Sequence, residues 1–83
     1  MDIKLLTEVS WGGNKLAPIV DEALKMLKWN YKYELIENPK ILAKLGIKTS
    51  PAMIVNDKII IEGRIPNVLQ MVEILENIEK EIG

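Results

Sequence analysis

Apolar and polar residues follow two periods along this chain, one typical of strands and the other of helices. Runs 3–7 and 31–36 are short and either apolar or alternating with charged residues, which predicts strands with a covered face. Run 52–55 is apolar at every position, so we expect it centrally in the sheet. Run 58–62 is expected to return as the second strand of a hairpin, because the Asn-Asp pair at 56–57 tolerates positive φ angles.

The remaining apolar positions recur at helical spacing in three segments. The first helix is predicted over 14–27, with its first residue as N-cap and Pro18 about one turn in, where it would kink a helix that began earlier. The second is predicted to open with the Asn-Pro pair at 38–39 and to end at Gly46. The third follows Asn67, a further N-cap candidate.

The predicted element order is therefore β-α-β-α-β-β-α, which we assign to the α/β class as one domain over residues 1–83. The first two strands and the helix between them are expected to form a parallel crossover. The last two strands form an antiparallel hairpin, and the last helix lies on the sheet. The prediction is a four-stranded mixed sheet flanked by three helices.

The chain contains no cysteine and no histidine. It therefore forms no disulfide, offers no thiolate, and lacks both the usual general base near neutral pH and the commonest metal ligand. Its carboxylates show no metal-binding spacing, so we expect neither a metal nor a cofactor. Because a domain of 83 residues has no such staple here, its stability must come from efficient packing or from a partner.

The formal net charge is −1, with charges of both signs mixed along the chain. A nucleic-acid or acidic-membrane surface needs clustered basic residues, so we expect neither partner. No apolar run reaches the roughly 18–20 residues that span a bilayer, and the first residues lack the regions of a signal peptide, which favours the cytoplasm. The abundance of Ile, Lys and Glu is typical of thermophile proteins, and also of AT-rich genomes.

Two segments resemble the thioredoxin family. Residues 12–22, Gly-Gly-Asn-Lys-Leu-Ala-Pro-Ile-Val-Asp-Glu, are similar to its active-site loop and the helix behind it. In that family a Cys-x-x-Cys motif opens the helix, and a proline five residues after the second Cys kinks it. Counting back from Pro18 places the two cysteine positions at Ser10 and Gly13. Residues 46–51, Gly-Ile-Lys-Thr-Ser-Pro, resemble the segment that carries the family's cis-proline.

The resemblance covers nearly the whole chain. Residues 56–58 and 62–66 are similar to the small thioredoxin/glutaredoxin-like proteins of archaea and bacteria. What the resemblance implies about function depends on the positions at which this chain departs from the family's motif. The loop of Ser10, Trp11, Gly12 and Gly13 holds no sulfur, and thiol–disulfide exchange needs a thiolate with a lowered pKa. We therefore expect no catalytic residue here, and without a histidine Ser10 cannot form a Ser–His pair.

The resemblance also implies a binding groove beside a cis-proline at Pro51. In the family, the backbone before this proline pairs with an extended substrate strand, a β-augmentation mode that needs no cysteine. Ser50 would offer that backbone here. Trp11 is expected either to meet the partner, as aromatic hot spots do, or to fold back on the domain. Arg64, the only arginine, would either read a carboxylate or remain a solvated loop cation.

The leading hypothesis is a redox-inactive module that binds a protein, an extended peptide or a second copy of itself in this groove. One alternative is a disulfide oxidoreductase or electron carrier, which requires that the chain be an altered copy of a Cys-bearing parent. Ser10 is a substitution engineers use for cysteine, whereas Gly13 fits that origin poorly because glycine weakens a helix start. The other alternative is a structural homo-oligomeric subunit that assembles through an edge strand.

Overall fold

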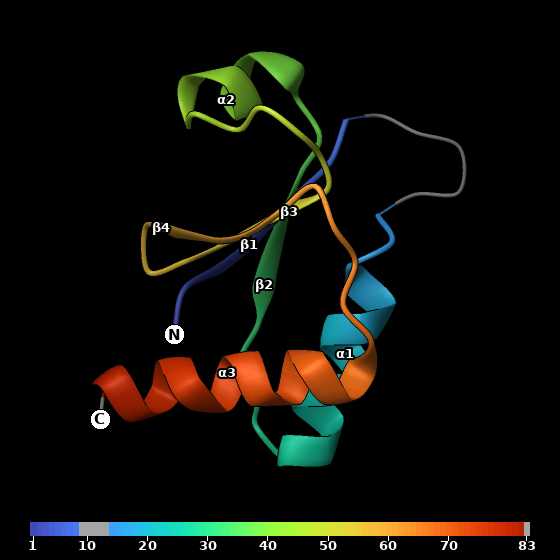
Figure 1. The fold of residues 1–83 in the computed structure, drawn as a ribbon, viewed down its shortest axis with the longest axis vertical. Coiled ribbons are helices and arrows are strands. Elements are labelled where there is room, and N and C mark those ends of the chain that lie inside the picture. The colour runs from blue at the N-terminus through green and yellow to red at the C-terminus, as the bar shows by residue number, and fades with distance from the viewer. Residues whose placement is uncertain (9–13, 83) are drawn as a thin grey trace.

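A computed structural model of the chain describes residues 1–8 and 14–82 (Figure 1). Its elements follow the predicted order β-α-β-α-β-β-α, so the predicted α/β class is confirmed. They are β1 (Ile3–Leu6), α1 (Ala17–Leu27), β2 (Tyr33–Ile36), α2 (Pro39–Lys44), β3 (Ala52–Val55), β4 (Lys58–Glu62) and α3 (Val68–Ile82). Within the described ranges, no helix is long and apolar enough to cross a membrane.

The four strands form one mixed sheet in the order β2-β1-β3-β4. β1 is parallel to β2 and antiparallel to β3, and β4 returns antiparallel beside β3. The fully buried β3 therefore lies inside the sheet, as its continuous apolar run predicted. β2 begins two residues later than expected: its parallel ladder with β1 starts at the pair Ile3 and Tyr33, so residues 31–32 lie outside the sheet.

Helices cover both faces of the sheet: α1 and α3 lie on one side and α2 on the other (Figure 1). Because successive strand side chains point to opposite faces, each central strand feeds two cores. The larger core joins β1, β3 and β4 to α1 and α3, and its buried members are Ile3, Leu5, Leu16, Val20, Ala23, Leu24, Met53, Val55, Ile61, Met71 and Leu75. The smaller core lies under α2 and consists of Leu6, Leu42, Ile47, Ala52 and Ile54.

The predicted N-cap of the first helix, Asn14, lies two residues before the observed N-cap of α1, Leu16, whose own side chain makes no cap bond. The Oδ1 atom of Asn14 accepts hydrogen bonds from the backbone N–H groups of Leu16, at 2.9 Å, and Ala17, at 3.3 Å. Among the described residues α1 begins at Ala17, so Pro18 occupies its first turn. There the missing N–H of proline costs nothing, because that group would have no partner within the helix.

The other predicted caps and the hairpin are confirmed. Asn38 accepts a hydrogen bond from the N–H of Lys40 at 2.9 Å and so caps α2. Asn67 and Gln70 exchange bonds of 2.8 and 3.0 Å between side chain and backbone, a reciprocal cap that fixes the start of α3. Residues 56–57 have φ angles of 50° and 67°, as the tight turn between β3 and β4 requires.

Candidate functional site

The segment between α2 and β3 carries the predicted binding residues. Gly46 ends α2 with a φ angle of +83°, and the buried Ile47 then donates its N–H to the carbonyl of Leu42 at 2.9 Å. These contacts anchor the first part of the segment on the smaller core. The Ser50–Pro51 peptide bond that follows is cis, and the chain enters β3 directly after it.

The end of β4 holds this loop from the other side. One carboxylate oxygen of Glu62, Oε2, accepts hydrogen bonds from the backbone N–H groups of Lys48, at 2.6 Å, and Thr49, at 3.3 Å. The N–H of Gly63 donates to the carbonyl of Pro51 at 2.8 Å. Glu62, the last residue of β4, and Gly63, the residue after it, therefore hold the loop on both sides of Ser50. Sequence reasoning placed Glu62 at the end of the last strand and in the family-like segment 62–66, and it missed this role.

Gly63 is required by the same contact. Its φ angle is +76°, a region that favours glycine, and a Cβ added there would lie 2.8 Å from the Cγ2 of Thr49. The backbone of β4's exit thus approaches the loop more closely than any residue with a side chain would allow. This close approach brings the connection to α3 next to the Ser50–Pro51 bond.

Ser50 presents its main chain without a partner of its own. Across residues 1–8 and 14–82, no hydrogen bond occupies its backbone N–H or C=O, and both Ser50 and Pro51 are partly exposed. A main-chain donor and acceptor next to the beginning of β3 are the groups that an added strand would use. The backbone groups of Ser50 that sequence analysis singled out therefore have no hydrogen-bond partner among the described residues.

Two exposed apolar side chains follow the loop contact. Ile65 is 44% exposed and Leu69 is 66% exposed, whereas Pro66 between them is buried and anchors the connection. In Figure 1 this connection, drawn in orange, leads from β4 to the start of α3, and α3 packs against α1. Arg64 lies on the same connection and is exposed, and it forms no ion pair with the described residues. Its predicted contact with a carboxylate stays a prediction.

The predicted redox-like loop of Ser10, Trp11, Gly12 and Gly13 lies outside the described residues. The structure does describe both of its flanks. At the end of β1, the buried Thr7 donates its N–H to the carbonyl of Ile36 at 3.0 Å. Before the start of α1, the side chain of Asn14 holds the N–H groups of Leu16 and Ala17.

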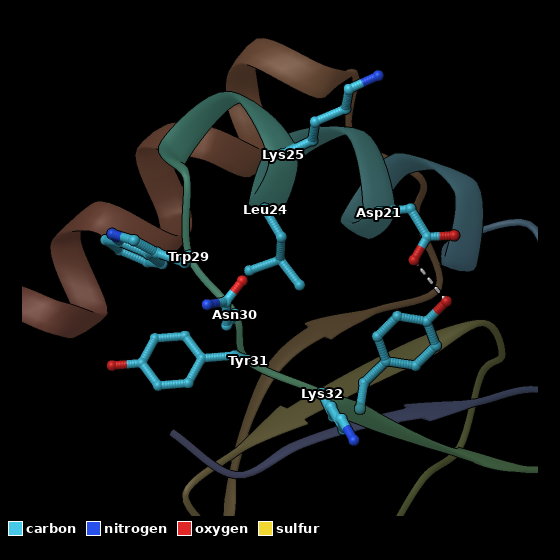
Figure 2. Close-up of a pocket in the computed structure, with 8 residues that line it drawn as sticks. Asp21, Leu24, Lys25, Trp29, Asn30, Tyr31 and Lys32 are labelled. Atoms are coloured by element: carbon cyan, nitrogen blue, oxygen red, sulfur yellow. Dashed lines mark hydrogen bonds between the residues drawn. The ribbon is translucent and has the colours of Figure 1, made fainter.

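A hollow of about 550 Å³ lies elsewhere, between α1 and the segment that leads into β2 (Figure 2). Figure 2 shows Leu24 pointing into this space, and the lining residues are Asp21, Leu24, Lys25, Trp29, Asn30, Tyr31, Lys32 and Tyr33. Trp29 meets Tyr31 edge to face with ring centroids 5.6 Å apart and packs against the larger core.

The hydroxyl groups around this hollow already have partners in the chain. Tyr33 donates to the carboxylate of Asp21 at 2.7 Å, and this hydrogen bond, with burial as a lesser cause, raises the pKa of Tyr33 to about 12. Tyr31 bonds the carboxylate of Glu79 on α3 at 3.2 Å, which likewise raises the pKa of Tyr31. These bonds tie the entry of β2 to both helices on that face, so we interpret the hollow as a structural joint.

No feature of the described residues points to a metal centre. Among residues 1–8 and 14–82, no group of three or more acidic side chains lies close enough to hold a metal ion. Lys4 carries the ion pairs found there, at 3.4 Å from Asp2 and 3.9 Å from Asp57, and these join the start of β1 to the β3–β4 turn. These ion pairs therefore stabilise the fold, and they lie at the opposite end of β3 from the Ser50–Pro51 loop.

The sheet order, the helices on both faces and the loop that ends in Pro51 define a protein of the thioredoxin-like class. The chain belongs to the thioredoxin domain family, whose sequence profile matches residues 1–76. The structure is similar to that of thioredoxin 1 from the thermophilic eubacterium Thermosipho africanus TCF52B, with a TM-score of 0.66, 18% sequence identity and 96% of each chain covered. At this identity the similarity concerns the fold alone. No curated protein sequence matches the chain.

Proposed function

We propose that this thioredoxin-fold chain binds an extended peptide segment of a partner protein at the Ser50–Pro51 loop and does not exchange disulfides. The second part of the proposal follows from composition. Exchange proceeds by attack of a thiolate on a disulfide sulfur through a mixed disulfide, and the chain has no cysteine to form either species. A serine hydroxyl is not ionised near neutral pH, so Ser10 does not substitute for the thiol.

The observation that carries the binding proposal is the main chain of Ser50. Its N–H and C=O have no hydrogen-bond partner in the described part of the chain, and they lie directly before Pro51 and the start of β3. An extended peptide can satisfy both groups by pairing as an additional strand. The loop is already held by Glu62 and Gly63, so little conformational entropy is lost when a peptide binds.

Exposed apolar side chains on the same connection support a peptide rather than a small polar ligand. Ile65 and Leu69 offer surface on which an apolar peptide side chain can pack. Main-chain pairing gives affinity without sequence preference, whereas such side-chain contacts supply preference. We therefore expect the partner segment to be extended, free of proline at the paired position and apolar at a neighbouring one. Trp11 and Arg64 are further candidates for contact with it.

The binding test uses cysteine-free linear peptides selected on the folded chain from a random displayed library and then synthesised. Binding is measured by calorimetry, and amide NMR shifts locate it; we expect the largest shifts at Ser50, Ala52 and Ile65. A matched peptide that is N-methylated at the paired position should lose most of its affinity, because it lacks the donor. If no selected peptide binds, the proposal fails. If the amide shifts concentrate on β2 or β4, the proposal also fails, and pairing through an edge strand is favoured instead.

The redox test compares the chain with a variant in which sulfur is restored, Ser10→Cys combined with Gly13→Cys. Reduction of insulin disulfides by dithiothreitol is the assay. We expect the cysteine-free chain to give the uncatalysed rate and the double variant to exceed it, because the variant has the two thiols that disulfide exchange requires. Turnover by the purified chain without cysteine would contradict the proposal. Equal inactivity of the restored variant would indicate that more than sulfur is missing.

A further inference from the structure

The contact between Glu62 and the loop before Pro51 joins residues that are 13 and 14 positions apart in the chain. In this contact, a side chain of β4 binds the backbone of the loop that contains Ser50. From it we infer that Glu62 is a positioning residue, whose carboxylate sets the orientation in which the Ser50 backbone meets a peptide. This inference rests on the peptide-binding function proposed above.

The geometry of the contact suits this role. A single oxygen of Glu62, Oε2, accepts from two successive backbone N–H groups, those of Lys48 at 2.6 Å and Thr49 at 3.3 Å. Hydrogen bonds to an ionised carboxylate are shorter and stronger than neutral ones, so this is a firm restraint on an exposed loop. With both preceding peptide planes held, the plane that carries the N–H of Ser50 can turn only about the φ and ψ bonds of Thr49.

The second restraint acts on the other side of Ser50. The N–H of Gly63 donates to the carbonyl of Pro51 at 2.8 Å, and Gly63 directly follows Glu62. Ser50 is thus bracketed by two contacts made by adjacent residues, one through a side chain and the other through the backbone. The backbone contact survives any substitution at position 62, so loss of the carboxylate is expected to loosen the loop without detaching it.

Three variants test whether peptide binding depends on the length of the Glu62 side chain, on its charge or on the presence of an acceptor at all. Glu62→Ala removes the acceptor. Glu62→Asp keeps the charge but is one methylene too short to reach both N–H groups, and Glu62→Gln keeps an acceptor oxygen without charge. The matched control is Glu34→Ala. Glu34 is a similarly exposed glutamate on β2, the opposite edge strand, and its side chain forms no hydrogen bond or ion pair with the described residues.

The measurement is the Kd of the selected peptide, taken by calorimetry well below each variant's Tm. We expect Glu62→Ala and Glu62→Asp to bind about tenfold more weakly, which is the loss of roughly one charge-assisted hydrogen bond. Glu62→Gln should bind about threefold more weakly, and Glu34→Ala should be unchanged. Amide hydrogen exchange at Lys48 and Thr49 in the free variants should accelerate in step with the loss of affinity. A purely structural role would lower Tm and leave the Kd of the folded fraction unaltered.

The outcomes separate this inference from the function on which it rests. If the natural chain binds the peptide and Glu62→Ala and Glu62→Asp bind it equally well, the positioning role is wrong and the binding function stands. If the natural chain binds no selected peptide, the function fails and the role of Glu62 falls with it. If Glu62→Ala proves unfolded, Glu62→Asp and Glu62→Gln decide, because both retain a polar side chain of similar size.

Discussion

The close approach of Gly63 to Thr49 predicts how much a single methyl group at this point will destabilise the fold. Replacement of Gly63 by alanine has two consequences. The residue must keep a φ angle of +76°, which a residue with a Cβ adopts at a cost of about 1 kcal/mol. The new Cβ must also fit 2.8 Å from Cγ2 and 3.1 Å from Cβ of Thr49, a distance at which one of the two groups has to move.

A second glycine in the chain isolates the first of these terms. Gly46 has a similar φ angle of +83°, yet a Cβ there would meet nothing within 4 Å. Gly46→Ala should therefore lower the free energy of unfolding by about 1 kcal/mol, the conformational term alone. Gly63→Ala adds the overlap with Thr49, which for a forced contact of this kind is about 1–2 kcal/mol. We expect a total of about 2–3 kcal/mol for Gly63→Ala.

The assay is urea unfolding of the two alanine variants followed by circular dichroism, together with Thr49→Ser alone and combined with Gly63→Ala. Serine lacks the Cγ2 methyl, so the combined variant should regain about 1 kcal/mol of the overlap, whereas Thr49→Ser alone should change little. For a domain of this size, the loss in Gly63→Ala corresponds to a fall in Tm of roughly 10 °C or more. Equal destabilisation of both alanine variants, or no recovery with serine, would refute the reasoning.

Further predictions concern the β2 joint, the core and a cap. Tyr33→Phe removes the 2.7 Å bond to Asp21 and should cost about 0.5–1 kcal/mol. Because that bond raises the pKa of Tyr33 from 10.0 to about 12, its contribution is fully present below pH 10 and is lost as the pH rises towards 12; a pH series of urea unfolding, which the phenylalanine variant should flatten, checks this. Leu5→Ala in the larger core should lower the free energy of unfolding by about 3 kcal/mol in the same measurement. Leu69→Ala, at a 66% exposed position, should leave stability nearly unchanged and weaken binding of the selected peptide. Asn67→Ala should cost about 1 kcal/mol through loss of the α3 cap, seen as a lower urea midpoint at constant slope.

Sequence reasoning was most accurate where the determinants are local. The positive φ angles of the hairpin at 56–57, the cap of Asn38 and the glycine after α2 each depend on a residue and its immediate neighbours, and each was predicted correctly. The length of β2 was not predicted correctly, because alternation along one segment does not fix where its pairing with a neighbouring strand begins. The ladder with β1 starts at Ile3 and Tyr33, and residues 31–32 lie outside it.

The sequence by itself determined the element order, the thioredoxin-like class and the absence of cysteine thiols. Periodicity and capping residues act over a few positions, and folding cannot supply a residue type that the chain lacks. Only the tertiary structure decided that Glu62 and Gly63 grip the loop before Pro51 and that Tyr33 bonds Asp21 across the β2 joint. Those contacts join residues that are 12 to 14 positions apart, and they depend on strand register and chain direction, which short-range patterns do not encode.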